Sequence, residues 1–248
     1  MTTVFSRISD TRPEEFRRVI DVTMNGAVWG TMAALRRMTP RRRGTIVQVG
    51  SALAYRAIPL QAAYCAAKHG MRAFTDSLRS ELIHDRIPIH LTMVHLPGLI
   101  TPQFTWCHSH MERQAQPVPP IFQPEIAAEA VHWAAHHRRR EIYVGFPTVQ
   151  AVLGSKLAPG FLDGYLARNA FEEQMTNSPA PRSRPFNLFA PVPGDHGARG
   201  IFDQRARNRD WFSWLSVRAG AAGVRVAGAA LALIVVTAVL LGAVAIIR

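Results

Sequence analysis

The chain has 248 residues, 48% of them hydrophobic, and carries a formal net charge of +12. That length is enough for one ordinary domain with extensions, and the first ten residues lack the apolar core of a signal peptide. Of the 29 basic residues only Lys68 and Lys156 are lysines, and the arginines are scattered rather than interleaved with aromatic residues. No nucleic-acid partner is therefore expected, and an anionic lipid surface explains the arginines more simply.

The elements predicted along the chain alternate between helices and strands. The helices show apolar spacings of three and four residues, and the strands are short runs rich in β-branched residues. In chain order we expect a helix over 13–38, a strand over 45–50, a helix over 61–84, a strand over 89–96, an irregular loop over 99–123, a helix over 124–137, a strand over 141–146 and one or two helices over 148–175. Residues 176–210, rich in Pro, Arg and Gly, are typical of a linker or loosely packed tail.

This alternation predicts an α/β fold, because parallel strands need helical crossovers. Three strands are few for a doubly wound sheet, and the chain begins on a helix. We therefore expect the C-terminal half of a doubly wound Rossmann-type parallel sheet. The strand over 45–50 would then expose an apolar edge, which favours aggregation or pairing with another chain, including a second copy in a homo-oligomer.

An apolar run near the C-terminus predicts a membrane segment. Residues 226–247 read VAGAALALIVVTAVLLGAVAII, with no charge and no proline. At about 1.5 Å of rise per residue, a helix over this run would span the roughly 30 Å hydrocarbon core of a bilayer. Trp211 and Trp214 lie upstream, where interfacial aromatic residues are common, and the many arginines before the run favour the cytoplasmic side. We expect a C-terminal tail anchor with the catalytic portion in the cytoplasm.

The strongest candidate site lies in the stretch SALAYRAIPLQAAYCAAKHG, which begins at Ser51. Tyr64 and Lys68 are four residues apart and so share one face of the predicted helix. A nearby cation favours the phenolate and lowers a tyrosine pKa, so the pair could act as an acid–base group. Ser51 follows a strand directly, at the edge where open α/β sheets bind ligands. A surface pair beside a turn serine is the alternative, since Y-x-x-x-K alone is a weak motif.

With these residues in view, the sequence resembles the short-chain dehydrogenase/reductase family. The matching features are Asn25 in VTMNGAVWG, the strand and serine of GTIVQVGS, the motif Y-C-A-A-K, and the strand that ends in LPG. The resemblance covers roughly residues 10 to 145. It implies an oxidoreductase that interconverts an alcohol and a ketone or aldehyde by hydride transfer with NAD or NADP.

The resemblance also implies a role for each matching residue. Ser51 would orient the substrate oxygen, Tyr64 would be the general acid or base, and Lys68 would bind the nicotinamide ribose and lower the tyrosine pKa. Asn25 would hold a water of the proton relay. The remaining cofactor contacts implied by the resemblance are Pro97 and Gly98, which would lie along the nicotinamide, and Thr101, whose spacing after the proline is one residue shorter than usual.

The family's N-terminal glycine-rich motif, T-G-x-x-x-G-x-G, does not occur in this chain. We therefore expect a truncated family domain over 1–146, a helical extension over 147–175, a linker over 176–221 and a transmembrane helix over 222–248. Such a chain alone should be poorly soluble and should not bind the cofactor; a stable monomer with micromolar cofactor affinity would contradict this. The alternative function is a non-catalytic, membrane-anchored fragment that only pairs with other chains.

The remaining signals are weaker. His132 and His136 have a helical metal-binding spacing, but no third ligand is evident, so the sequence predicts no metal site. Cys65 and Cys107 lack a metal-binding spacing, and no disulfide is expected in a cytoplasmic setting. The apolar loop LITPQFTWCHSHM suggests a lipophilic substrate, although a loop that packs into the core would have the same composition.

Overall fold

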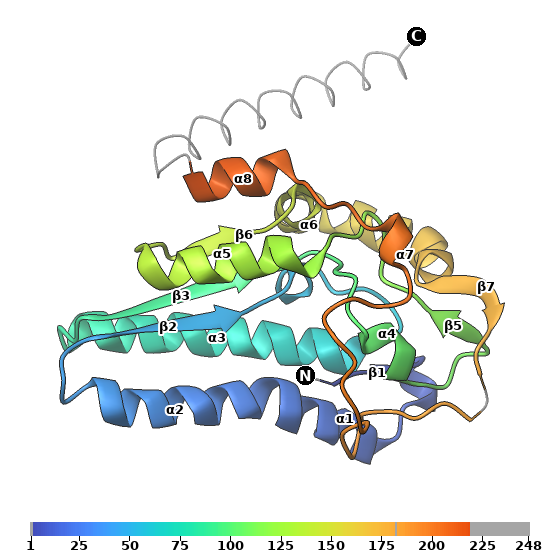
Figure 1. Ribbon diagram of the computed structural model, residues 1–248, viewed down its shortest axis with the longest axis horizontal. Helices are drawn as coiled ribbons and strands as arrows, with labels where there is room; N and C mark the ends of the chain where they lie inside the picture. Colours follow the sequence, from blue (N-terminus) through green and yellow to red (C-terminus); the bar gives the residue numbers. More distant parts are fainter. Residues whose placement is uncertain (1, 182, 219–248) are drawn as a thin grey trace, which may run out of the picture.

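The computed structural model describes residues 2–181 and 183–218, and its centre is a sheet of three parallel strands between two helical layers (Figure 1). The strands are β1 Val4–Phe5, β2 Gly44–Val49, β3 Ile89–His95, β4 His108–Ser109, β5 Arg113–Ala115, β6 Glu141–Tyr143 and β7 Met175–Pro179. The helices are α1 Pro13–Ile20, η2 Asp21–Asn25, α2 Gly26–Met38, α3 Ala62–His84, α4 Gln103–Trp106, α5 Pro124–His136, α6 Phe146–Leu157, α7 Pro159–Glu173 and α8 Trp211–Arg218, with short 3₁₀ turns η1 Ile8–Asp10, η3 Ala52–Ala54 and η4 Asp203–Arg205.

The central sheet has the strand order β2-β3-β6, and both pairs are parallel, which confirms the predicted α/β class. Gly44 of β2 lies opposite Ile89 of β3, and Val49 lies opposite Val94, so the carboxyl ends of the two strands stay level. This register brings the residues that follow each strand to one edge of the sheet. Ser51 and Pro97 are both at that edge.

Each face of the sheet is covered by helices whose apolar sides follow the helical period. On one face, Ile46 and Leu91 of the sheet pack with Leu78 and Leu82 of α3. On the other face, Val94 and Ile142 pack with small residues of α5 and with α8 beyond it, as seen in Figure 1. The two cores fix α3 beneath the strands, so the positions of its polar side chains are well determined.

The helix predicted over 13–38 is continuous but contains a wider turn. Residues Asp21–Asn25 form a π-helical segment, in which the N–H of Gly26 donates to the carbonyl of Asp21. Such turns within α-helices are frequent at functional sites. Periodicity over the whole segment predicted the helix correctly but could not reveal this turn, because a single extra residue barely disturbs the apolar pattern.

The segment predicted to be an irregular loop, 99–123, contains short elements. Helix α4 and strands β4 and β5 lie in it, and β4 pairs in parallel with β1, a strand that the sequence pattern missed. Its apolar side chains point inward: Ile100, Cys107 and Phe122 are all buried. Core packing accounts for the composition of this loop, so its apolar character no longer argues for a lipophilic substrate.

The predicted linker, 176–210, is more ordered than expected. Strand β7 overlaps its start and pairs antiparallel with β5, and Leu188 is fully buried in a cluster with Val4, Val19 and Tyr64. Arg18 Nε also donates to the Leu188 carbonyl at 3.0 Å. The expectation of a loosely packed tail is therefore wrong for this part, because one buried leucine is enough to hold a Pro-rich segment against the body of the protein.

Among the described residues, no helix is long and apolar enough to cross a bilayer. The predicted transmembrane run at 226–247 lies outside the described residues. The edge of β2 is uncovered within the described ranges, as predicted: Val49 is 44% exposed, and Trp29 and Met32 on the neighbouring helix α2 are also exposed. These side chains form an apolar surface beside the candidate site.

Candidate functional site

The structure brings Ser51, Tyr64 and Lys68 together at the carboxyl end of β2. Ser51 leaves the strand in an extended conformation and caps the short turn η3, where its Oγ accepts a hydrogen bond from the N–H of Leu53 at 3.1 Å. Gly50 precedes it because a Cβ there would lie only 2.8 Å from Nδ1 of His95. Tyr64 and Lys68 come from successive turns of α3, as their spacing predicted.

The three side chains are all buried, with 8% of Ser51, 8% of Tyr64 and 5% of Lys68 exposed. Burial raises the pKa of Tyr64 above its usual value, and the hydrogen-bonding interaction with Ser51 opposes that rise. The Lys68 Nζ lies 5.7 Å from the centre of the Tyr64 ring. The three residues therefore form a small polar group that is enclosed by apolar packing and largely shielded from bulk water.

Lys68 makes its hydrogen bond to the neighbouring strand rather than to Tyr64. Its Nζ donates to the carbonyl of Val49 at 2.7 Å, and burial lowers the pKa of Lys68 to about 8. Burial is the largest influence on the Tyr64 pKa and raises it, so the lowering of that pKa by Lys68 stays a prediction. The lysine is instead positioned by the edge strand itself.

Titration of Lys68 makes stability pH-dependent. Below pH 8 both the folded and the unfolded chain hold the proton, and the folded chain carries the full cost of burying the ammonium group. Between about pH 8 and the ordinary value of 10.5 only the unfolded chain keeps the proton, so stability should rise with pH, by up to about 3 kcal/mol. Lys68→Met should abolish this rise in denaturant titrations, whereas Lys156→Met, at an exposed position, should retain it. An equal rise in both variants would contradict the assignment.

Asn25 ends the π-helical segment η2, which packs against α3. Its Nδ2 donates to Asp21 Oδ1 at 2.9 Å across the π-helical turn. The preceding residue, Met24, lies against Gly70 of α3, where a Cβ would come within 2.6 Å of the Met24 Sδ. The turn and the helix thus meet closely, two residues beyond Lys68.

The residues implied to face the cofactor are partly covered by the chain itself. A Cβ on Gly98 would lie 2.8 Å from the Val118 carbonyl, and the Gly98 carbonyl accepts the N–H of Phe122 at 3.0 Å. A Cβ on Gly200 would lie 2.5 Å from the Thr101 carbonyl oxygen. Pro97 packs near Gly145. Residues 117–122 and Gly200 therefore lie against the segment that follows β3.

A network of partly and fully buried polar side chains, which the sequence did not reveal, contacts the backbone of Ser51 through His95. Glu141 accepts hydrogen bonds from Tyr55 at 2.9 Å and from Tyr143 at 2.8 Å. His95, fully buried, stacks on Tyr143, and its two ring nitrogens lie 3.3 Å from the Ser51 carbonyl and 3.5 Å from Glu141. Burial raises the pKa of Glu141, but the hydrogen bonds from these three side chains bring it down to about 2.

The two cysteines are both buried, and burial raises the pKa of each thiol to about 11. Cys65 therefore remains a neutral thiol beside Tyr64, in agreement with the packing role predicted for it. Neither thiol has the thiolate character that a nucleophile requires.

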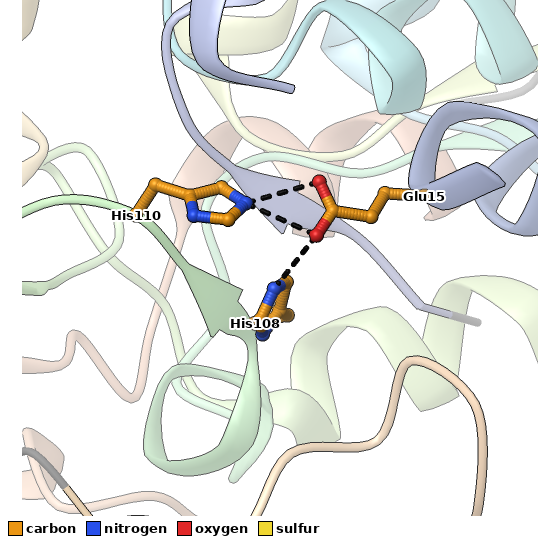
Figure 2. Close-up of side chains that lie close together, drawn as sticks. All are labelled: Glu15, His108 and His110. Carbon is orange, nitrogen blue, oxygen red and sulfur yellow. Dashed lines mark hydrogen bonds and ion pairs between the residues drawn. The ribbon is translucent and has the colours of Figure 1, made fainter. Parts of the chain in front are cut away.

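A second polar cluster lies away from Tyr64. Glu15 of α1 meets His108 and His110 around β4, and Figure 2 shows both imidazoles directed at the one carboxylate. The H-x-H spacing at 108–110 was the available sequence signal, but its partner is 93 residues earlier in the chain. His132 and His136, the pair considered from the sequence, have ring centres 4.9 Å apart on the exposed face of α5.

The comparisons with known proteins agree with this geometry. Residues 2–112 match the family model described as short chain dehydrogenase. The chain is 28% identical over 226 residues to the uncharacterized oxidoreductase YxnA of Bacillus subtilis, covering 90% of this chain and 63% of that protein. It is 32% identical over 173 residues to dehydrogenase/reductase SDR family member 7B of Xenopus tropicalis, covering 67% of this chain and 55% of that protein.

A solved structure shows the same fold. A short-chain dehydrogenase from Streptomyces avermitilis superposes with a TM-score of 0.52 at 20% identity, covering 70% of this chain and 67% of that one. The parallel α/β architecture of this chain is thus the one found in that dehydrogenase. Residues 2–112 are similar to the short-chain dehydrogenase family, and the chain spans less than two thirds of the length of the two curated relatives.

Proposed function

We propose that this protein is an oxidoreductase that interconverts an alcohol and a ketone or aldehyde, with Tyr64 as general acid or base. The observation that carries the proposal is the convergence of Ser51, Tyr64 and Lys68 in a buried group at the carboxyl end of β2. Parallel α/β sheets bind ligands at that edge. The similarity of residues 2–112 to the short-chain dehydrogenase family supports the same class of reaction.

Each residue of the group has a chemical task that its surroundings permit. The Ser51 hydroxyl holds the substrate oxygen by a hydrogen bond, next to the Tyr64 hydroxyl. Tyr64 then gives a proton to that oxygen in reduction or removes one in oxidation, in a site that excludes bulk water. Lys68 places a positive charge at the carboxyl end of β2, where the phenolate of Tyr64 would form. A nicotinamide cofactor, NAD or NADP, would supply or accept the hydride.

The described residues fit such a cofactor only at its reacting end. Lys68 is suited to the ribose hydroxyls, but none of the described strands leads into a glycine-rich turn of the kind that holds a pyrophosphate. Gly98, expected along the nicotinamide, is approached by the Val118 carbonyl. We therefore expect the affinity of this chain for the cofactor to be weak.

The close approach of Val118 to Gly98 favours a second candidate, a non-catalytic protein that pairs with other chains through its exposed β2 edge. In that case the Ser–Tyr–Lys group would be a remnant of the family's site. A tail anchor at 226–247 would hold the protein, under either proposal, at the cytoplasmic side of a membrane.

The test is turnover by the purified full chain at millimolar NAD(H) or NADP(H), followed by absorbance with a panel of alcohols and ketones. We expect that the turnover rate increases with cofactor concentration throughout the micromolar range without reaching saturation. The reason is that nothing among the described residues holds the pyrophosphate. Saturation in the low micromolar range would contradict the expected weak affinity. Absence of both turnover and cofactor binding at millimolar concentration would favour the non-catalytic candidate.

A further inference from the structure

Three side chains from distant parts of the sequence converge beside the N-terminal turn of α1. His108 Nε2 lies 3.0 Å from Oε1 of Glu15, and His110 Nε2 lies 3.1 Å from Oε1 and 3.0 Å from Oε2 (Figure 2). The two histidines are separated by one residue, so an extended backbone turns both rings to the same side. The ligand atoms that these three described residues could offer to a metal all lie within 4.8 Å of one another.

The ligand types and spacing suit a transition metal. Zinc binds imidazole nitrogen at about 2.0–2.1 Å and carboxylate oxygen at about 2.0–2.2 Å, so a tetrahedral site places neighbouring ligand atoms about 3.4 Å apart. The oxygen–nitrogen distances of 3.0 Å are already close to that value. To bind the ion, the ligand atoms would have to separate only from 3.0 Å to about 3.4 Å.

The surroundings prepare these groups for a cation. The Glu15 side chain is fully buried, and its carboxylate accepts hydrogen bonds from the Arg12 backbone N–H at 2.9 Å and from Arg12 Nε at 3.0 Å, which fix its orientation. His108 keeps only 16% of its side chain exposed, so its imidazole is held in place beside the carboxylate. His110 keeps 29% of its side chain exposed, so water can reach the open side of the cluster.

We propose that Glu15, His108 and His110 form a binding site for a divalent transition metal, with zinc the ion that matches these ligands. Two imidazoles and one carboxylate leave at least one coordination position for water. The site would tie the segment after β3 to α1. Phe16, next to Glu15, packs against the cluster that contains Tyr64, so the bound ion would brace the helix layer behind the Ser–Tyr–Lys group.

The test is a zinc titration of the purified, untagged full chain in competition with a chromophoric chelator. We expect one Zn²⁺ per chain, with affinity lowered by about 100-fold or more in His110→Ala, since removing even an outer partner of a zinc ligand costs on the order of 10–100-fold. Because His110 is partly exposed, this variant should fold, which circular dichroism verifies. The matched control His132→Ala/His136→Ala removes an exposed pair on α5 and should leave zinc affinity unchanged.

Two further measurements keep the proposal falsifiable. Glu15→Gln retains the shape of the side chain and its contact with Arg12, and it should also weaken zinc binding. X-ray absorption of the zinc-loaded wild-type chain, which depends on no variant, should show scattering from two imidazoles. A wild-type chain that binds no stoichiometric zinc, or binds it equally well without His110, would reduce the cluster to a hydrogen-bonded ion pair and overturn the proposal. Loss of binding in the His132/His136 control would overturn it as well.

Discussion

Replacing Tyr64 with phenylalanine should lower turnover by about 10²–10⁴-fold while leaving the fold intact. The hydroxyl is the only group removed, and proton transfer by a positioned side chain typically contributes a factor of that size. The ring itself, 8% exposed and packed with Val19 and Leu188, stays in place. The measurement is kcat at millimolar cofactor for both proteins, with thermal unfolding as the test of folding.

Tyr165→Phe is the matched control for this experiment. Its hydroxyl lies on the exposed face of α7 and makes only a long contact, 3.5 Å, with Glu173. Turnover of this variant should equal that of the wild type. If Tyr64→Phe also kept its activity within a few-fold, Tyr64 would not be the acid–base group, and the role assigned to it from the family resemblance would fail.

Glu141→Gln should reduce the free energy of unfolding at pH 7 by about 3 kcal/mol, and this difference should vanish in acid. The Glu141 pKa is lowered from the ordinary 4.5 to about 2 by its hydrogen bonds, so the folded state gains stability from the ionised carboxylate at any pH above 4.5. As the pH falls from 4.5 towards 2 the carboxylate takes up a proton and that contribution is lost. Denaturant titrations across this range measure the difference.

A surface carboxylate provides the comparison for Glu141. Glu172 forms an ion pair of 2.7 Å with Arg113, but 70% of its side chain is exposed. Exposed pairs contribute about 0–1 kcal/mol, so Glu172→Gln should change stability little at any pH. Glu15 also titrates near pH 2, but it is present in both proteins and cancels from the difference. A Glu141→Gln chain as stable as the wild type at pH 7 would show that the network is not stabilising.

Local patterns were sufficient to predict the part of the site that lies on one helix. Tyr64 and Lys68 are separated by one helical turn, so the apolar period of 61–84 placed them on one face before any contact was known. Ser51 was placed by the end of the preceding strand. The order of helices and parallel strands followed from the same periodicities, because each strand needs a crossover.

Contacts between distant segments could not be predicted in this way. Glu141 reaches Tyr55 across 86 residues, and Glu15 reaches His108 across 93. No local pattern encodes such a meeting, which depends on how β1 and the loop after β3 fold back on α1. The direction of the Lys68 ammonium was missed for a related reason: a backbone carbonyl on the neighbouring strand, rather than the tyrosine on its own helix, accepts its hydrogen bond.

The π-helical turn at Asp21–Asn25 sets the rotational phase of α2. One residue fewer in this turn would rotate everything after Asn25 by about 100° about the helix axis. Thr31, whose Oγ1 now accepts a buried 2.7 Å hydrogen bond from Gln48, would swing away from the sheet, and Leu35 and Met38 would leave the core. The extra residue therefore sets the rotation of α2 about its axis relative to α1. Insertion or deletion of a residue at this point would change which face of α2 packs against the sheet, while α1 would stay in place.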